Sequence, residues 1–387
     1  MKFEFATANR IIFGKHVIEE VPPIAADMGR RACVVTGRTS GRAALLMEQL
    51  KTEGLKTSVF HISGEPTIQM VSEGVEQARR ARSDLVIGMG GGSVVDGGKA
   101  ISALLTNSGS LLDYLEIIGK GKEIVEASAP FIAIPTTAGT GAEVTRNAVI
   151  GSPEHGVKVS MRSPLMLPRL AVVDPLLTMS MPPALTAFTG LDALTQLIEA
   201  FVSKRANPLT DGICREGMKR AARSLLTAFQ DGRNQAARED MALASLLSGL
   251  ALANAGLGAV HGFAGPLGGM LFAPHGALCG LLLPLVMAAN VHALSTRTPG
   301  SPALARYEEV AQILTGVSTA RAVDGVTWVQ DLCATLKVPP LAEYGLKERD
   351  FPAVVEKVRR ASSTKGNPIV LTDNELTQIL TKAVYYN

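Results

Sequence analysis

The C-terminal half of the chain holds two histidines and one acid in largely apolar surroundings. His261 and His275 share a Gly- and Pro-rich stretch, and each is followed by a glycine that lets the backbone pack closely and the imidazole project. Asp192 lies in the apolar helical segment G-L-D-A-L-T-Q-L-I-E, where an unpaired buried carboxylate would be costly. A divalent metal would supply the partner, and this donor set suits Fe²⁺ or Zn²⁺ better than Mg²⁺.

Each of these residues also has a structural interpretation. A histidine on an apolar face is usually a hydrogen-bonded core residue, and Asp192 could cap a helix that begins after Gly190. Gln196 lies one helical turn after Asp192 on the same face, so its amide oxygen is a candidate fourth ligand. Hydrogen bonding of Gln196 inside the cleft is equally compatible with the sequence.

A second stretch with chemical potential is S-D-L-V-I-G-M-G-G-G-S-V-V-D-G-G-K, residues 83–99. An apolar run, expected as a buried strand, opens through Gly90, Gly91 and Gly92 into a segment with helical spacing. The free N–H groups and the dipole of a helix N-terminus attract anions. Glycines accept positive φ and present no Cβ to an approaching phosphate. The loop therefore predicts a diphosphate cradle, although a tight strand-to-helix turn would also need glycine.

The bulk composition is typical of a compact α/β enzyme with two domains. The chain has 387 residues, of which 47% are hydrophobic and 19% charged. Its net charge is +3 without a long basic run, so nucleic acid is not an expected partner. Cys33, Cys214, Cys279 and Cys333 lack C-x-x-C spacing and are expected as core residues.

Neither the N-terminus nor the most apolar stretch indicates a membrane or secreted protein. The first ten residues lack the apolar segment of a secretory signal, which predicts a cytoplasmic location. The stretch 277–291 contains Pro284 and is shorter than the roughly 20 residues of a membrane span, so we expect a buried helix there.

Short apolar strands alternate with helices up to about residue 178, which predicts a mostly parallel sheet with helices on both faces. The predicted strands are 32–36, 57–62, 85–89, 131–135 and 171–174, and the predicted helices between them are 42–53, 68–82 and 94–106. Long helices follow at 184–202, 208–230, 239–255 and 373–386, with Pro266 expected between helices. The sequence thus predicts an α/β dinucleotide-binding domain over residues 1–178 and an all-α metal-binding, catalytic domain over residues 179–387.

Six ordered motifs and a tail give nearly the whole chain a resemblance to a known family. They are G-G-G-S-V-V-D-G-G-K (90–99), P-T-T-A-G-T-G-A-E (135–143), A-V-V-D-P (171–175), G-L-D-A-L-T-Q-L-I-E (190–199), V-H-G-F-A-G-P-L-G (260–268), A-P-H-G (273–276) and N-P-I-V-L-T (367–372). The chain resembles the iron-containing (group III) alcohol dehydrogenases, which have the dehydroquinate synthase-like fold. The resemblance implies reversible hydride transfer between a nicotinamide cofactor, NAD(P), and a small alcohol or aldehyde, in a homodimer or larger homo-oligomer.

The resemblance also implies roles for single residues. The positions implicated in cofactor binding are Gly91, Gly92, Ser93, Asp96, Thr136, Thr137, Thr140 and Lys158. Asp192, His261 and His275 match three ligands of the catalytic metal, Fe²⁺ or Zn²⁺, and Gln196 replaces the family's remaining histidine. Because a neutral amide is a weaker ligand than an imidazole, we expect the affinity for the metal, or the choice of metal, to change.

Two further departures from the family pattern bear on the reaction. Gly265 stands where many relatives carry a histidine thought to relay protons, which enlarges the pocket and puts that proton route in doubt. Gly37 stands where NAD-preferring relatives often have an Asp, and Arg38, Ser40 and Arg42 lie nearby. Loss of an anion and gain of a guanidinium favour the 2′-phosphate of NADP(H).

Other functions stay open at this point. Maleylacetate reductase, a metal-independent branch of the fold, fits the altered ligand set, but that branch tends to lack the carboxylate found here at Asp192. Dehydroquinate synthase fits less well because its ligand pattern includes Glu and its basic phosphate pocket is not evident. A metal-free binding protein with this fold would bind dinucleotide but show no metal-dependent turnover of any alcohol.

Overall fold

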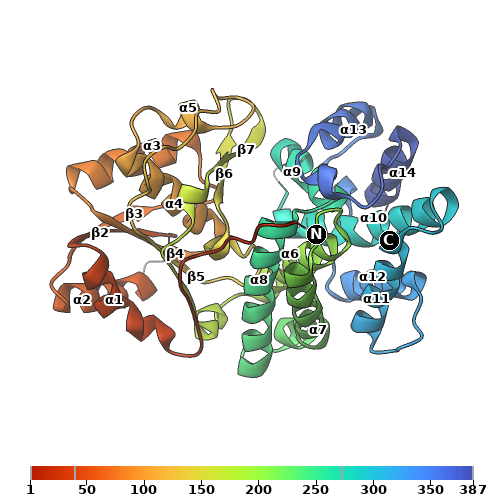
Figure 1. Cartoon of the computed structure of the whole chain (residues 1–387), viewed down its shortest axis with the longest axis horizontal. Helices are drawn as coiled ribbons and strands as arrows, with labels where there is room; N and C mark the ends of the chain where they lie inside the picture. Colours follow the sequence, from red (N-terminus) through yellow and green to blue (C-terminus); the bar gives the residue numbers. More distant parts are fainter. Residues whose placement is uncertain (1, 39–40, 272, 386–387) are drawn as a thin grey trace. The chain divides into compact units, whose positions relative to one another are not determined.

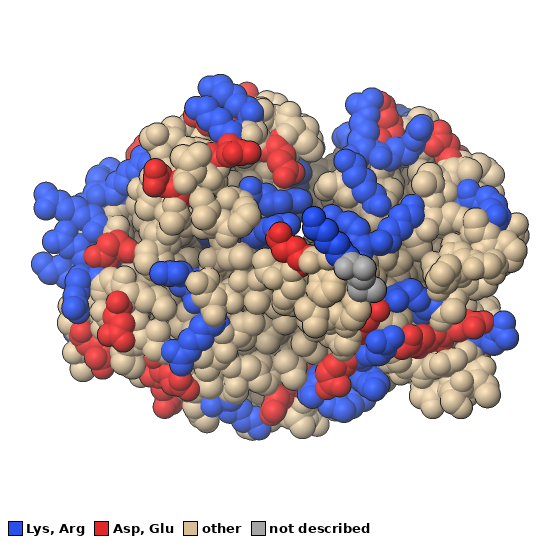
Figure 2. All heavy atoms as spheres, in the orientation of Figure 1, with Lys and Arg blue, Asp and Glu red and all other residues tan. Residues whose placement is uncertain are grey.

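The structure is a computed structural model that describes residues 2–38, 41–271 and 273–385. The chain divides into two compact units. One consists of Ala6–Thr137 and Gly141–Met179, and the other of Met1–Phe5, Ala138–Thr140 and Ser180–Asn387. The face shown in Figure 2 carries both basic and acidic side chains, with basic ones gathered at its left edge and a wide uncharged area in the middle.

The first unit contains a six-stranded parallel sheet in the order β1-β8-β5-β4-β2-β3 (Figure 1). Its strands are β1 (Ile11–Phe13), β2 (Arg31–Thr36), β3 (Lys56–His61), β4 (Leu85–Gly90), β5 (Phe131–Pro135) and β8 (Leu170–Val173). The predicted parallel sheet is confirmed. The short edge strand β1 was missed, because three half-buried residues give too little pattern.

Helices cover both faces of this sheet, as predicted. They are α1 (Val21–Met28), α2 (Gly41–Thr52), α3 (Ile68–Arg80), α4 (Gly92–Thr106) and the short α5 (Leu111–Tyr114). Val34 and Ile87 pack with α1 and α2, whereas their neighbours Cys33 and Val86 pack with α3 and α4. Successive residues of a strand point to opposite faces, so strands buried on both faces have continuous apolar sequences.

The helix α4 lies close against the sheet. A Cβ at Gly98 would come within 2.7 Å of the Phe131 ring, and a Cβ at Gly88 within 2.8 Å of the same ring. Glycine at both positions therefore leaves room for the ring between α4 and the sheet. Gly98, near the end of the motif 90–99, is therefore required for the packing of α4 against the sheet.

An antiparallel hairpin of β6 (Asn147–Ser152) and β7 (Val157–Arg162) was not predicted. Buried residues recur at alternate positions in both strands, and Gly156 in the turn has a φ of 59°, which favours glycine. This period of two, with the turn between the strands, is the signal that would have revealed the hairpin.

The buried Lys99 joins α4 to the segment that leads into this hairpin. Its Nζ donates to the backbone oxygens of Ala142 (3.0 Å) and Asn147 and to Thr145 Oγ1 (2.8 Å). It also lies 3.0 Å from Asp96 Oδ1. The charge is therefore fully paired, which a buried ammonium requires.

The second unit is helical. Its helices are α6 (Pro183–Val202), α7 (Pro208–Gln230), α8 (Gln235–Ala255), α9 (Ala259–Leu271), α10 (His275–Arg297), α11 (Pro302–Thr315), α12 (Ala322–Thr335), α13 (Phe351–Arg360) and α14 (Asp373–Val384). The predicted helical character is confirmed, but Pro266 lies inside α9 rather than between helices. The predicted end of the last helix, residue 386, lies outside the described residues.

Two helices of this unit, α6 and α10, are long and apolar enough to cross a membrane, and α8 with α9 would also qualify but for a 102° bend. However, 83% of the most apolar stretch of α6 and 78% of that of α10 are buried inside the protein. The predicted burial around 277–291 is confirmed. The helix is longer than predicted, because α10 includes Pro284 and has 23 residues in all. Packing against other helices explains the hydropathy.

Glu143, in the short 3-10 helix Ala142–Val144, gives the first unit a testable pH dependence. Burial raises the pKa of this carboxyl to about 7. A hydrogen bond to its own backbone and the charge of Lys99 lower the pKa, but by less than burial raises it. In the unfolded chain Glu loses its proton near pH 4.5, so the folded state binds more protons between about pH 4.5 and 7. Stability contributed by this group therefore falls as the pH rises through that window, by roughly 3 kcal/mol.

We expect Glu143→Gln to raise the thermal midpoint by several degrees at pH 8 and to leave it nearly unchanged at pH 4.5. Scanning calorimetry at the two pH values measures the difference. The exposed Glu126→Gln serves as the matched control and should show no such dependence. An equal change at both pH values would contradict the assignment to a titrating buried carboxyl.

Candidate metal centre and nucleotide loop

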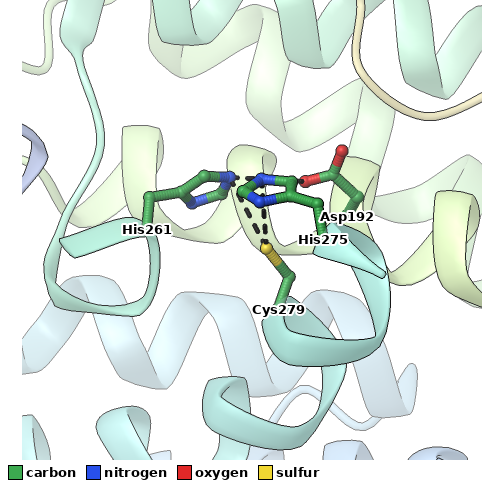
Figure 3. Close-up of side chains that lie close together, drawn as sticks. All are labelled: Asp192, His261, His275 and Cys279. Atoms are coloured by element: carbon green, nitrogen blue, oxygen red, sulfur yellow. Dashed lines mark hydrogen bonds and ion pairs between the residues drawn. The ribbon is translucent and has the colours of Figure 1, made fainter. Parts of the chain in front are cut away.

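Three helices of the second unit bring four potential metal ligands together. Asp192 comes from α6, His261 from α9, and His275 and Cys279 from α10 (Figure 3). One ligand atom from each residue lies within 4.8 Å of the other three. The structure thus brings together the three residues that the sequence indicated, and it adds Cys279.

The separations between these atoms are short. Asp192 Oδ1 is 3.3 Å from His261 Nε2 and 3.7 Å from His275 Nε2. Cys279 Sγ is 3.8 Å from His261 Nε2 and 3.6 Å from His275 Nε2. Figure 3 shows both imidazoles directed toward the carboxylate and the sulfur. Oxygen, nitrogen and sulfur donors thus converge on one point, the donor chemistry of an Fe²⁺ or Zn²⁺ site.

Glu199 positions His261. This buried residue lies two turns after Asp192 on α6, and its Oε1 accepts the backbone N–H of Val260 at 2.7 Å, which satisfies a free donor at the start of α9. Its Oε2 lies 2.7 Å from His261 Nδ1. Because a carboxylate can only accept, Nδ1 carries the proton and Nε2 is left to coordinate. Sequence analysis missed this role, although Glu199 ends the predicted motif.

His275 and Cys279 are positioned by the start of α10. The two residues are four apart on one helix, so their side chains share a face. A Cβ at Gly276 would collide with the backbone oxygen of Phe188 on α6, so glycine permits the close approach of the two helices. A Cβ at Gly262 would likewise collide with Thr364, which confirms that the glycine after each histidine allows close packing.

The titratable groups of the site, Asp192, His261 and His275, shift one another's pKa values. Burial by itself would raise the pKa of Asp192, but a hydrogen bond from His261 and the positive charge of His275 hold it below its usual value. Burial would lower the pKa of His261, yet its interactions with Cys279 and a hydrogen bond to Asp192 raise it well above its ordinary value. Burial would lower the pKa of His275 too, but its interactions with Cys279 and Asp192 together raise it above its ordinary value. The cluster therefore attracts positive charge.

Gln196 lies beside this cluster but is engaged in hydrogen bonds. Its Oε1 accepts from Ser248 Oγ at 2.7 Å, and a hydrogen bond from its side chain contributes to the low pKa of Asp192. The side chain is 3% exposed, so both interactions are inside the protein. Its predicted role as a ligand stays a prediction.

Cys279 is the candidate ligand that sequence reasoning missed. It is fully buried, as expected of a core residue, but its sulfur faces two imidazoles rather than only apolar side chains. The available signal was the spacing H-x-x-x-C, because residues four apart on a helix can bind one ion.

The residues predicted to hold the cofactor follow neighbouring strands of the first unit. Gly37 follows β2, Gly91 follows β4 and Thr136 follows β5, and these strands are adjacent in the sheet. The helices after β2 and β4, α2 and α4, cover opposite faces. Open α/β sheets bind nucleotides at such a reversal, outside the carboxyl ends of the strands.

The helix α4 begins at Gly92, and no described side chain caps its N-terminus. The N–H groups of Val94 and Val95 both bond to the oxygen of Gly91, at 2.9 and 3.1 Å. Contrary to the expectation that these glycines are needed for a positive φ, none of the glycines 90–92 has one. Close packing explains Gly90 instead, since a Cβ there would lie 2.6 Å from Val94 Cβ.

The other predicted cofactor residues lie in different surroundings. Ser93 is half-buried in the first turn of α4, and Thr137 lies beside Gly91, where an added Cβ would be 3.4 Å from its methyl carbon. Asp96 Oδ2 accepts the N–H of Val149 at 3.1 Å, and burial raises the pKa of Asp96 despite the nearby Lys99.

The remaining predicted cofactor residues, Lys158, Arg38 and Thr140, lie in three different places. Lys158 Nζ lies 2.5 Å from Glu65 Oε1, and Arg38 is exposed. Thr140 belongs to the helical unit, unlike the rest of the predicted set. Ser40 and the side chain of Arg42 lie outside the described residues.

Comparison with known proteins gives matches along nearly the whole chain. Residues 8–175 match the sequence model of iron-containing alcohol dehydrogenases, and residues 186–384 match that of the C-terminal part of the same family. Alcohol dehydrogenase 4 of Saccharomyces cerevisiae (strain YJM789) is 34% identical over 97% of this chain and 96% of its own. The 1,3-propanediol dehydrogenase of Klebsiella pneumoniae is 34% identical over 98% of both chains.

Solved structures agree with these matches. A crystal structure described as 1,3-propanediol oxidoreductase has a TM-score of 0.91 and 34% identity, covering 99% of this chain and 100% of its own. A sulfoacetaldehyde reductase from Bifidobacterium kashiwanohense, in complex with NAD⁺, has a TM-score of 0.88 and 30% identity, covering 100% of both chains.

The fold and these matches define an oxidoreductase that acts on CH–OH groups. The chain belongs to the iron-containing alcohol dehydrogenase family. The predicted family, its two-part fold and a metal-dependent, nicotinamide-dependent alcohol dehydrogenase activity are thereby confirmed.

The close approach at Gly276 yields a prediction about the metal centre. In Gly276→Ala the new methyl group collides with the Phe188 carbonyl, so the start of α10 must move and carry His275 away from Asp192. We expect a loss of stability of about 1–3 kcal/mol and a clear fall in bound metal, measured by thermal unfolding and by metal analysis after dialysis.

Gly212→Ala on α7 is the matched control, because an added Cβ there meets nothing within 4 Å. Alanine is the better helix former, so this variant should be as stable as the parent or slightly more so and should keep its metal. Full metal content and unchanged stability in Gly276→Ala would show that the helix contact does not position His275.

Proposed function

We propose that the chain uses a divalent metal, Fe²⁺ or Zn²⁺, held by Asp192, His261 and His275, to interconvert small alcohols and aldehydes. The convergence of buried carboxylate, imidazole and thiol donors within 4.8 Å is the observation that carries this proposal. Such donors suit these metals better than Mg²⁺. When bound, the metal polarises the substrate oxygen and stabilises negative charge on it.

The residues around the proposed metal would fix its surroundings. Glu199 holds Nδ1 of His261 and so keeps Nε2 directed at the site. Burial of Asp192 and Cys279 excludes water from one side, which strengthens electrostatic interactions there. His275, with 37% of its side chain exposed, would border the open side that admits substrate.

The proton released from the alcohol cannot pass through a side chain at position 265, where this chain has a glycine. Space beside Gly265 is open, since an added Cβ would meet none of the described atoms within 4 Å. Glycine offers no titratable group, so we propose that the proton leaves by water or by a ribose hydroxyl of the cofactor.

For the cofactor, we propose that the glycine loop and the start of α4 bind the pyrophosphate of NAD(P). The uncapped N–H groups of Gly92 and Ser93 support this role. Thr136 and Thr137, after the adjacent strand, and Asp96, Thr140 and Lys158 are proposed as further contacts. Gly37 in place of an acid, with the exposed Arg38, supports a preference for NADP(H).

We further propose that residues 1–178 form the dinucleotide-binding domain and residues 179–387 the metal-binding domain. A homodimeric assembly and a cytoplasmic location stay predictions.

The metal dependence can be tested on protein stripped with a chelator and reloaded with Fe²⁺ or Zn²⁺. We expect stripping to abolish aldehyde-dependent NADPH or NADH oxidation and reloading to restore it. Asp192→Asn should lower kcat/KM by at least about 100-fold and reduce bound metal, because it removes the only proposed anionic oxygen ligand. The exposed Asp331→Asn is the control and should behave as the parent.

Maleylacetate is included among the substrates of this experiment. Turnover of maleylacetate by stripped enzyme, with no aldehyde activity after reloading, would contradict the proposed metal chemistry and place the chain in the reductase branch.

The cofactor preference can be tested at Arg38. If its guanidinium binds the 2′-phosphate, Arg38→Ala should raise KM for NADPH by about tenfold or more and leave KM for NADH unchanged, since one charge-assisted hydrogen bond contributes roughly 1.5–3 kcal/mol. Steady-state kinetics with both cofactors measure this. The exposed Arg80→Ala is the control, and unchanged kinetics in both variants would exclude Arg38 from the cofactor site.

A further inference from the structure

We propose that Cys279 is a protein ligand of the metal and supplies, as a thiolate, the donor that the family obtains from the histidine replaced here by Gln196. This inference rests on the proposed metal dependence and deepens it. It concerns the composition of the ligand set, in which a soft sulfur donor replaces a nitrogen.

The separations around Cys279 match those of a tetrahedral site. With metal–nitrogen and metal–oxygen bonds of about 2.0–2.1 Å and a metal–sulfur bond of about 2.3 Å, tetrahedral geometry places nitrogen and oxygen ligands about 3.3 Å apart and nitrogen and sulfur ligands about 3.6 Å apart. Asp192 Oδ1 lies 3.3 Å from His261 Nε2, and its distance of 3.7 Å from His275 Nε2 is somewhat longer than the ideal value. The distances from Cys279 Sγ to His275 and His261 are 3.6 and 3.8 Å. The sulfur therefore lies at ligand distance from both imidazoles.

Gln196 is a less suitable ligand than a thiolate, because its amide is neutral and has polar partners inside the protein, Ser248 and Asp192. Ser248 Oγ lies 2.7 Å from Gln196 Oε1 and 2.8 Å from the backbone oxygen of Ser245, and its single hydroxyl proton is donated to one of these two oxygens at a time. The side chain also hydrogen-bonds Asp192. Gln196 is thus a positioning residue for Asp192 rather than a donor to the metal.

The surroundings of Cys279 set it apart from the other cysteines. All four are free and buried. Cys214 and Cys333 lie on α7 and α12, and Cys333 Sγ contacts the backbone oxygen of Gly280 at 3.2 Å. Only Cys279, among the described residues, joins His and Asp side chains in a cluster that could hold a metal.

A thiolate in the ligand set has consequences for metal choice. Sulfur donors favour Zn²⁺, Co²⁺ and Fe²⁺ over Mg²⁺ and Mn²⁺, so Cys279 would restore the affinity that a neutral amide loses. Four protein ligands leave substrate to enter as a fifth, an expansion that catalytic zinc sites undergo.

Co²⁺ substitution tests the inference without relying on turnover. Protein stripped of metal is loaded with one equivalent of Co²⁺, bound metal is quantified, and the near-ultraviolet spectrum is recorded. A thiolate bound to Co²⁺ gives an intense charge-transfer band, whereas carboxylate, imidazole and amide ligands do not. We expect this band in the parent and in Gln196→Ala, and its loss in Cys279→Ser and Cys279→Ala.

Competition with a chromophoric chelator gives a second readout. We expect the dissociation constant for Zn²⁺ to rise at least about tenfold in both Cys279 variants. Cys214→Ala, which removes another buried thiol far along the chain, is the control and should keep both the band and the affinity. Circular dichroism of each variant verifies that it is folded, and the two Cys279 substitutions guard against misfolding of either one.

The outcomes separate this inference from the proposed function. Stoichiometric Co²⁺ binding without the band in the parent, or a band that persists without Cys279, would overturn the ligand assignment and leave metal-dependent activity standing. Failure of the folded parent to bind Co²⁺, Zn²⁺ or Fe²⁺ at all would overturn both.

Discussion

The hydrogen bonds of the buried Glu199 carboxylate fix the start of α9 in the helical unit and the orientation of His261. The carboxylate accepts the N–H of Val260 at the start of α9 and the imidazole proton of His261. A Cβ at Gly258 would lie 2.7 Å from its Oε1, so the chain can enter α9 only through glycine. One carboxylate thus satisfies a helix N-terminus and selects the tautomer of a histidine that we propose as a metal ligand.

The same interaction connects distant parts of the sequence. Asn367 accepts the N–H of Ala259, next to the bonds made by Glu199, and donates to Asn290 on α10 at 2.7 Å. Asn290 in turn donates to the hydroxyl of Tyr307 at 2.9 Å. The tail motif N-P-I-V-L-T therefore contributes to the site through its first residue, which helps to hold α9 and α10. A buried network of this kind is stable because its donors and acceptors are paired.

Burial of polar groups in very apolar helices also explains the hydropathy of this half. α6 and α10 would qualify as membrane spans by composition, yet they carry Asp192, Glu199 and His275. An apolar environment with few competing donors strengthens the interactions among those groups. The free-energy cost of burying the Asp192 carboxylate is reduced because two imidazoles face it.

Much of the α/β unit could be predicted from the sequence, because continuous apolar runs and glycine loops are local signals. The edge strand Ile11–Phe13 and the hairpin at 147–162 were missed where the runs were short or only partly buried. In the helical unit, α10 was located correctly but its extent was not, since Pro284 is accommodated within a helix whose stability comes from packing.

The residues Asp192, His261 and His275 and the glycine loop could be singled out from the sequence, because their residue types and spacing are unusual within apolar segments. The tertiary structure decided which further groups join them. Glu199 gives no such signal, and Cys279 gives only its spacing of four residues from His275. Both meet the other residues because α6, α9 and α10 pack closely at Gly258 and Gly276. Convergence of donor atoms from separate helices is set by packing, and spacing along one chain does not encode it.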